Sequence, residues 1–126
     1  MLTTTDAFSG FTVEDTEVAL AFYRDVLGLD AHLGEMGIIE FEHGSTRVIA
    51  YPKPGGQPAS YTVLNFVVPD IDAAADELEA SGVTLERYAG MHQDERGIMR
   101  GRATGDGPDI GWFTDPSGNI FSIIGE

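Results

Sequence analysis

The sequence contains no cysteine, and this absence removes three kinds of chemistry. A disulfide framework, a thiolate zinc site and a cysteine nucleophile are all excluded. Basic residues are also scarce, because 7 Lys and Arg stand against 21 Asp and Glu, which gives a formal net charge of −14. Such a charge repels phosphate backbones and anionic lipid surfaces. Neither nucleic acid nor a membrane is therefore expected as a partner.

Long apolar runs are missing as well. No run approaches the length of a membrane span, and the start MLTTTDAFSG lacks the basic and apolar parts of a secretory leader. We therefore expect a cytoplasmic protein. The length of 126 residues, of which 42% are apolar, predicts a single domain over residues 1–126 that buries its own core.

Two segments have helical patterning and share the same start and stop signals. In the first, residues 15–27, Asp15 or Thr16 can accept hydrogen bonds from the free amides of the helix start. Gly28 can then adopt the left-handed conformation that ends a helix. In the second, Asp70 precedes the apolar stripe of IDAAADELEA, and Gly82 follows it. A strand-like run precedes each helix, AFSGFTV in one case and YTVLNFVV in the other.

Short strands are predicted after each helix. The first half offers LDAHLGEMGIIEFEHG and STRVIAYPKP, and the second offers VTLERYAG, DIGWFTD and NIFSIIGE. Turns are predicted at His43-Gly44 and over residues 115–119, DPSGN. An offset of 55 residues places Phe11 on Phe66 and repeats the order of strand, cap, helix and stop. This order predicts an internal duplication.

The resulting fold class is α+β, with two βαβββ units. Unit one covers about residues 5–52, residues 52–60 form a linker, and unit two covers about residues 61–126. The units are expected to form an open, mixed β-sheet half-barrel with the functional cleft between them. The stretch from Met91 to Pro108 is longer than most connections, so we predict that it is a binding loop or lid.

The segments AFYRDVLGL, IDAAADELEASGV and DPSGNIFSI resemble the vicinal-oxygen-chelate superfamily, and V-x-D precedes each of the first two. That superfamily includes glyoxalase I, extradiol dioxygenases, fosfomycin-modifying enzymes and bleomycin-resistance binding proteins. The resemblance implies paired βαβββ units and a homodimer. It also implies a divalent metal held by His or Gln, Glu, His and Glu on four strands.

The positions of this sequence that match those four metal ligands hold Phe8, Ala50, Val63 and Ser122. A divalent ion needs several oxygen or nitrogen donors, and methyl or phenyl groups supply none. No metal and no cofactor are therefore expected, with a divalent metal as the alternative. The three histidines, His32, His43 and His92, lie outside the ligand positions.

Alternation along the strands predicts which side chains face the cleft. It turns Phe11, Phe66 and Phe121 toward the helices and leaves a largely apolar opposite face. Trp112 is a candidate stacking surface for a planar ligand, or else a core or dimer residue. Arg102 is a candidate clamp for an anionic group, or else a partner of nearby acids. The full predicted ligand-binding set is Phe8, Ala50, Val63, Asn65, Arg102, Trp112 and Ser122.

Three other aromatic residues, Tyr51, Tyr61 and Tyr88, carry the same two interpretations as Trp112.

The preferred function is metal-independent binding of an unknown small molecule, planar or amphipathic, as in sequestration of the bleomycin-resistance kind. The alternative is a glyoxalase-type lyase or isomerase, or a dioxygenase, with a non-standard metal site from His92, Asp94 and Glu95 or with none. A purely structural or regulatory dimer is a third possibility. No catalytic residue is assigned.

Overall fold

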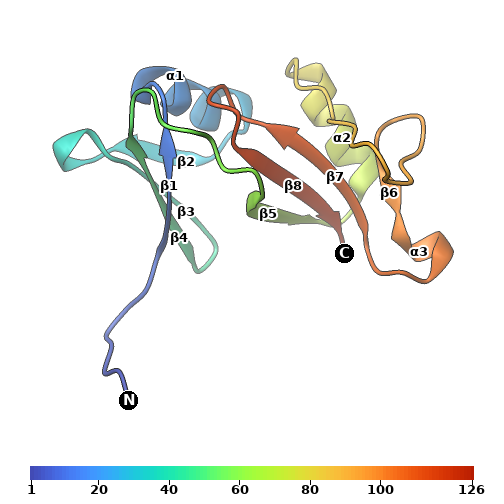
Figure 1. The fold of residues 1–126 in the computed structure, drawn as a ribbon, viewed down its shortest axis with the longest axis horizontal. Coiled ribbons are helices and arrows are strands. Elements are labelled where there is room, and N and C mark those ends of the chain that lie inside the picture. The colour runs from blue at the N-terminus through green and yellow to red at the C-terminus, as the bar shows by residue number, and fades with distance from the viewer. The chain divides into compact units, whose positions relative to one another are not determined.

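In the computed structural model, which describes residues 1–126, the first half of the chain forms a four-stranded sheet (Figure 1). Its spatial order is β1-β4-β3-β2. Strands β1 and β4 run parallel, whereas β3 is antiparallel to both of its neighbours. The strands are β1 Ser9–Val13, β2 Asp30–Leu33, β3 Ile39–His43 and β4 Thr46–Pro52.

The predicted first helix is present and follows β1. Helix α1, Thr16–Ala21, continues directly into a π-helical segment η1, Phe22–Val26. The Asp15 side chain caps it by accepting a hydrogen bond from the Val18 amide at 3.2 Å. Gly28 follows with φ of 71°, a conformation that glycine adopts without steric cost. A single 3₁₀ turn η2, Glu35–Gly37, lies between β2 and β3.

The core of this half lies between the helix and one face of the sheet. Tyr23 is fully buried there, and its ring lies 6.2 Å from the ring of Phe11 and 5.5 Å from that of Phe41. Ala50 belongs to the same face, because it pairs with the buried Ile39 and is itself 0% exposed. The open face of β4 is formed instead by the alternate residues of the strand.

The second half of the chain repeats the plan with a sheet of order β5-β8-β7-β6 (Figure 1). Strands β5 and β8 are parallel, and the other two pairs are antiparallel. Asp70 caps α2 through hydrogen bonds from the amides of Asp72 and Ala73, at 3.0 and 3.1 Å. The elements are β5 Thr62–Val68, α2 Ile71–Ala80, β6 Met99–Arg100, α3 Gly101–Thr104, β7 Asp109–Thr114 and β8 Ile120–Gly125.

Helix α2 covers one face of this sheet and buries its apolar stripe of Ile71, Ala75 and Leu78. Beneath it, the ring of Phe121 lies 5.6 Å from Phe113 and 6.2 Å from Phe66. Burying such aromatic side chains contributes about 1.5–3 kcal/mol each to folding. Within this unit, no helix covers the opposite face of the sheet in Figure 1, and the candidate site lies on that face.

The predicted fold class, with two βαβββ-like units, is confirmed. The chain divides into two compact units, Met1–Pro58 and Ala59–Glu126. None of the helices has the length and apolar character needed to cross a bilayer.

One predicted strand is wrong. Residues 83–90 form no strand, and the two-residue β6 occupies the sheet edge instead. Leu85 turns inward and packs against two glycines. A Cβ atom added to Gly97 would lie 3.3 Å from the Leu85 side chain, and one added to Gly111 would lie 3.2 Å from it. The stretch from Met91 to Pro108, predicted to be a binding loop or lid, contains β6 and α3.

Candidate functional site

A row of three side chains crosses the open face of the second sheet. Asn65 on β5 pairs in register with Ser122 on β8, which pairs in turn with Trp112 on β7. The Ser122 hydroxyl donates a hydrogen bond to Asn65 Oδ1 at 2.5 Å. Ser122 is fully buried, and Trp112 is only 8% exposed. The structure thus brings three of the predicted ligand-binding residues onto one face.

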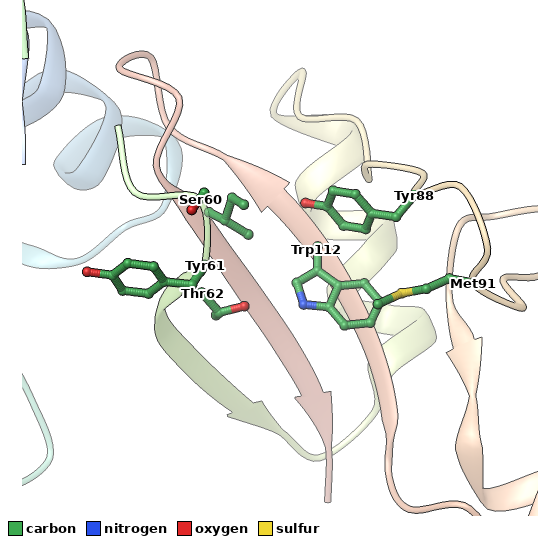
Figure 2. Close-up of a pocket in the computed structure, with 7 residues that line it drawn as sticks. Ser60, Tyr61, Thr62, Tyr88, Met91 and Trp112 are labelled. Carbon is green, nitrogen blue, oxygen red and sulfur yellow. The ribbon is translucent and has the colours of Figure 1, made fainter. Parts of the chain in front are cut away.

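Next to this row lies a hollow of about 210 Å³ (Figure 2). Its floor is formed by Trp112 and by Ile120, which pairs with Thr62 on one side and Thr114 on the other. In Figure 2 the Ser60–Thr62 segment lies on one side of Trp112, and Tyr88 and Met91 lie on the other. The lining residues are Ser60, Tyr61, Thr62, Tyr88, Met91, Trp112 and Ile120.

The predicted DPSGN turn holds the first wall in place. Asp115 accepts hydrogen bonds from the amides of Ser117 at 3.0 Å and Asn119 at 2.8 Å. The Asn119 side chain donates to Asp115 at 3.1 Å and accepts from the Ala59 amide at 3.1 Å. Both Asp115 and Asn119 are buried, so these bonds are protected from water. The turn therefore fixes the chain immediately before Ser60.

The second wall is tied to β7 by its backbone. The Glu86 amide donates to the carbonyl of Trp112 at 2.7 Å, which runs residues 86–88 alongside the strand. The ring of Tyr88 then meets that of Trp112 edge-on, with centroids 5.7 Å apart and an interplanar angle of 78°. Edge-to-face contact is a favoured geometry for aromatic pairs. Two aromatic rings thus meet at a right-angled corner of the hollow.

Gln93 closes the loop that carries Tyr88 and Met91. Its side-chain oxygen accepts from the Tyr88 amide at 2.8 Å. Its side-chain nitrogen donates to the carbonyls of Glu86 at 2.9 Å and Gly97 at 2.7 Å. All three hydrogen bonds are partly buried. One amide therefore joins three points of the loop, which makes Gln93 a positioning residue for the second wall.

The hydroxyl of Tyr88 is buried and has no hydrogen-bond partner. Burial raises the pKa of this phenol, and the nearby Glu86 carboxylate raises it further. Tyr88 is therefore protonated at neutral pH and holds a free hydrogen-bond donor. A buried polar group without a partner costs free energy in the unliganded protein.

A second hollow, of about 500 Å³, lies between the loop and α3, and Met91 and His92 are among the residues that line it. Asp94 lines it too but is already engaged. It accepts hydrogen bonds from Arg100 Nε at 2.8 Å and from the Ile98 amide at 2.9 Å. Burial opposes ionisation of Asp94, but these hydrogen bonds outweigh it and lower its pKa. Asp94 ties the loop together and is poorly suited to act as a base.

The other predicted ligand-binding residues lie elsewhere. Phe8 lies in the first unit, 57% exposed, with the Arg47 guanidinium 5.1 Å from its ring centroid. Ala50 lies in the core of that unit and does not face an open surface. Arg102 is exposed, and its side chain donates to the Gly125 carbonyl at 3.4 Å. Neither hollow is lined by any of these three residues.

Val63 departs from the expected strand alternation for a structural reason. The pairing of β5 with β8 is irregular between Thr62 and Leu64, so an extra residue is accommodated there. As a result Thr62, and not Val63, lines the hollow beside Ile120.

The residues that the family resemblance assigns to the four metal positions do not fit a divalent ion. Phe8, Ala50 and Val63 offer no donor atom, and the Ser122 hydroxyl is bonded to Asn65. Nor do three or more His, Asp or Glu side chains gather in a group that could hold a metal.

Some lining residues carried a signal in the sequence, and others did not. Alternation places Ile120 on the open face, and Tyr61 and Tyr88 are visible as candidate aromatic residues. Ser60 and Met91 follow no sequence pattern. The segments that carry them are held in place by hydrogen bonds of other side chains, Asn119 for Ser60 and Gln93 for Met91.

The sequence matches the model of the Glyoxalase/Bleomycin resistance protein/Dioxygenase superfamily over residues 6–123. The chain belongs to this superfamily. No curated protein sequence matches the chain. A solved member of the superfamily from Sphaerobacter thermophilus is 25% identical, with a TM-score of 0.67 over 97% of this chain and 98% of that one.

Two further solved structures share the fold. A lactoylglutathione lyase from Agrobacterium tumefaciens is 21% identical, with a TM-score of 0.66 over 97% of this chain and 94% of its own. An antibiotic binding protein from a Streptomyces species is 20% identical, with a TM-score of 0.63 over 98% of each chain. The superfamily fold thus occurs both in an enzyme and in a binding protein.

Proposed function

We propose that this superfamily member binds a planar small molecule in the hollow beside Trp112, without a metal. The observation that carries the proposal is the corner formed by Tyr88 and Trp112 above the apolar side chain of Ile120. Flat aromatic surfaces at a right angle suit a flat ligand, which can stack on one ring and meet the edge of the other.

The size of the hollow supports a small ligand. Its volume of about 210 Å³ is below the roughly 300–1,000 Å³ of pockets that hold drug-sized molecules. One or two fused rings are therefore the expected size of the bound group. The antibiotic binding protein of the same fold is consistent with a binding role, although its low identity carries no information on the ligand.

The chemistry of the walls also favours binding over catalysis. No Asp, Glu, His, Lys or Arg lines the hollow, so it holds no acid or base of ordinary strength near neutral pH. Of the residues named for a non-standard metal site, Asp94 is engaged by Arg100 and by backbone amides.

Binding can be tested by titrating the protein with coumarin and naphthalene, with cyclohexanol as a non-planar control, while fluorescence from the single tryptophan is recorded. Both planar probes are expected to change Trp112 fluorescence saturably, and cyclohexanol is not. Met91→Ala removes apolar contact from one wall and should weaken naphthalene binding roughly threefold to tenfold. Val67→Ala is the matched control, because Val67 is 66% exposed and lies outside the hollow.

Elemental analysis of the same samples separates this proposal from the enzyme alternative. Unchanged probe binding after dialysis against a chelator supports metal-independent binding. One equivalent of Zn, Ni, Mn or Fe per chain, with an activity that the chelator removes, would instead support a glyoxalase-type enzyme or a dioxygenase. Pairing of two chains, which the superfamily resemblance implies, is part of the proposal, and sedimentation tests it.

A further inference from the structure

The hydroxyl of Tyr88 is the one polar group of the hollow that is buried and has no partner. Figure 2 shows it pointing across the hollow toward the side of Ser60. The loop that carries it is held by Gln93 and by two hydrogen bonds that the Arg87 guanidinium donates to the backbone carbonyls of Asp94 and Glu95. Because this loop is held at several points, the donor is presented in a fixed direction.

A free protonated hydroxyl in a fixed direction selects for an acceptor. The group is protonated at neutral pH because burial and the Glu86 carboxylate both disfavour the phenolate. The hydroxyl is closed off from solvent in the unliganded protein, so an incoming carbonyl or ring nitrogen would accept its hydrogen bond once the neighbouring side chains move apart. A purely hydrocarbon ligand would leave the hydroxyl unpartnered and would keep the associated cost.

The charges around the hollow disfavour a charged ligand. The lining contains no cation to pair with an anionic group and no carboxylate to pair with a cationic one. Three arginines of the loop and the adjoining strand are engaged. Arg87 donates to backbone carbonyls, Arg96 pairs with Asp76, and Arg100 pairs with Asp72 and Asp94. The net charge of −14 also repels anions at longer range. A charged group would thus lose its hydration without gaining a partner.

We propose that the hollow selects planar, uncharged molecules whose edge carries a hydrogen-bond acceptor, and that the Tyr88 hydroxyl donates to that acceptor. The inference rests on the proposed function, since it names the class of ligand for the same site. Trp112 provides the stacking surface, and Tyr88 distinguishes an acceptor-bearing ring system from a plain hydrocarbon of the same shape.

Calorimetric titration with three bicyclic probes tests this selection. Coumarin is planar and carries a carbonyl, naphthalene has no acceptor, and coumarin-3-carboxylate adds a negative charge. On the wild-type chain, coumarin is expected to bind more tightly than both other probes. Tyr88→Phe should weaken coumarin roughly threefold to tenfold, the range of one net neutral hydrogen bond, and leave naphthalene unchanged. Tyr51→Phe is the control, because Tyr51 lies in the other unit and outside the hollow.

Failure of the selection and failure of the proposed function give different results. If coumarin and naphthalene both bind but Tyr88→Phe affects neither, the hollow binds planar molecules and the role of Tyr88 is wrong. Tighter binding of coumarin-3-carboxylate than of coumarin would overturn the uncharged ligand class. If neither neutral probe binds the wild-type chain, the proposed function fails together with this inference. The comparison of probes on the wild-type chain needs no variant and holds even if Tyr88→Phe does not fold.

Discussion

Replacing Gln93 by alanine should loosen the loop that carries Tyr88 without touching the sheet. The change removes three hydrogen bonds of the Gln93 side chain. One is accepted from the Tyr88 amide, and two are donated to the carbonyls of Glu86 and Gly97. Each neutral hydrogen bond contributes about 0.5–1.5 kcal/mol net. Water can replace part of this network because Gln93 is half-buried. We therefore expect a loss of about 1–3 kcal/mol in the free energy of unfolding.

Two further variants sharpen the test. Gln57→Ala is the matched control, because Gln57 is the only other glutamine and is exposed in the segment between the two sheets. It should change the free energy of unfolding by no more than about 0.5 kcal/mol. Gln93→Glu keeps an acceptor for the Tyr88 amide but turns a carboxylate oxygen toward two carbonyls. It should destabilise at least as much as Gln93→Ala.

Urea unfolding followed by Trp112 fluorescence measures these differences, and hydrogen exchange at the Tyr88 amide reports the loop itself. Exchange at this amide should speed up in Gln93→Ala and stay unchanged in Gln57→Ala. If Gln93→Ala unfolds at the same urea concentration as Gln57→Ala and the Tyr88 amide keeps its protection, Gln93 does not position the second wall.

Three more predictions concern stability. The hydrogen bond from Arg100 holds the pKa of Asp72 below 3.8, so the ionised Asp72 stabilises the fold above about pH 4, and this contribution is lost on further acidification. Asp72→Asn should therefore flatten the acid side of a plot of the urea midpoint against pH. Gly101→Ala should destabilise by about 1–3 kcal/mol in thermal or urea unfolding, because its Cβ would lie 2.6 Å from the Pro108 carbonyl oxygen. Tyr88→Phe removes an unpartnered hydroxyl, so thermal melting without ligand should occur at the same temperature or higher.

The repeated plan of the fold follows from local signals in the sequence. Asp70 caps the second helix, and Asp15, one of the two predicted candidates, caps the first; Gly28 and Gly82 follow these helices with positive φ. These signals act over a few residues, so they can be identified without tertiary information. The strand prediction for residues 83–90 is wrong because apolar residues of this segment are buried although its backbone forms a loop. The strand that does lie at the sheet edge has only two residues, too few to show alternation.

The candidate site was predictable only where it depends on strand alternation. That rule places Ser122 and Ile120 on the face opposite Phe121, and the pairing of β7 with β8 adds Trp112 beside Ser122. It fails at Val63, where the β5–β8 pairing is irregular. The approach of Tyr88 to Trp112 depends on hydrogen bonds from a loop, which follow no period in the sequence. The predicted cleft between the two units stays a prediction.

The most direct test of planar-ligand binding is chemical-shift mapping of the ¹⁵N-labelled chain during titration with coumarin, after dialysis against a chelator. If coumarin binds beside Trp112, saturable shifts are expected at the Trp112 indole and at the amides of the two walls, with little change in the sheet of residues 9–52. The wall amides are those of Ser60, Tyr61, Thr62, Tyr88 and Met91. No shifts at saturating coumarin, or shifts confined to residues 9–52, would contradict a planar-ligand site beside Trp112.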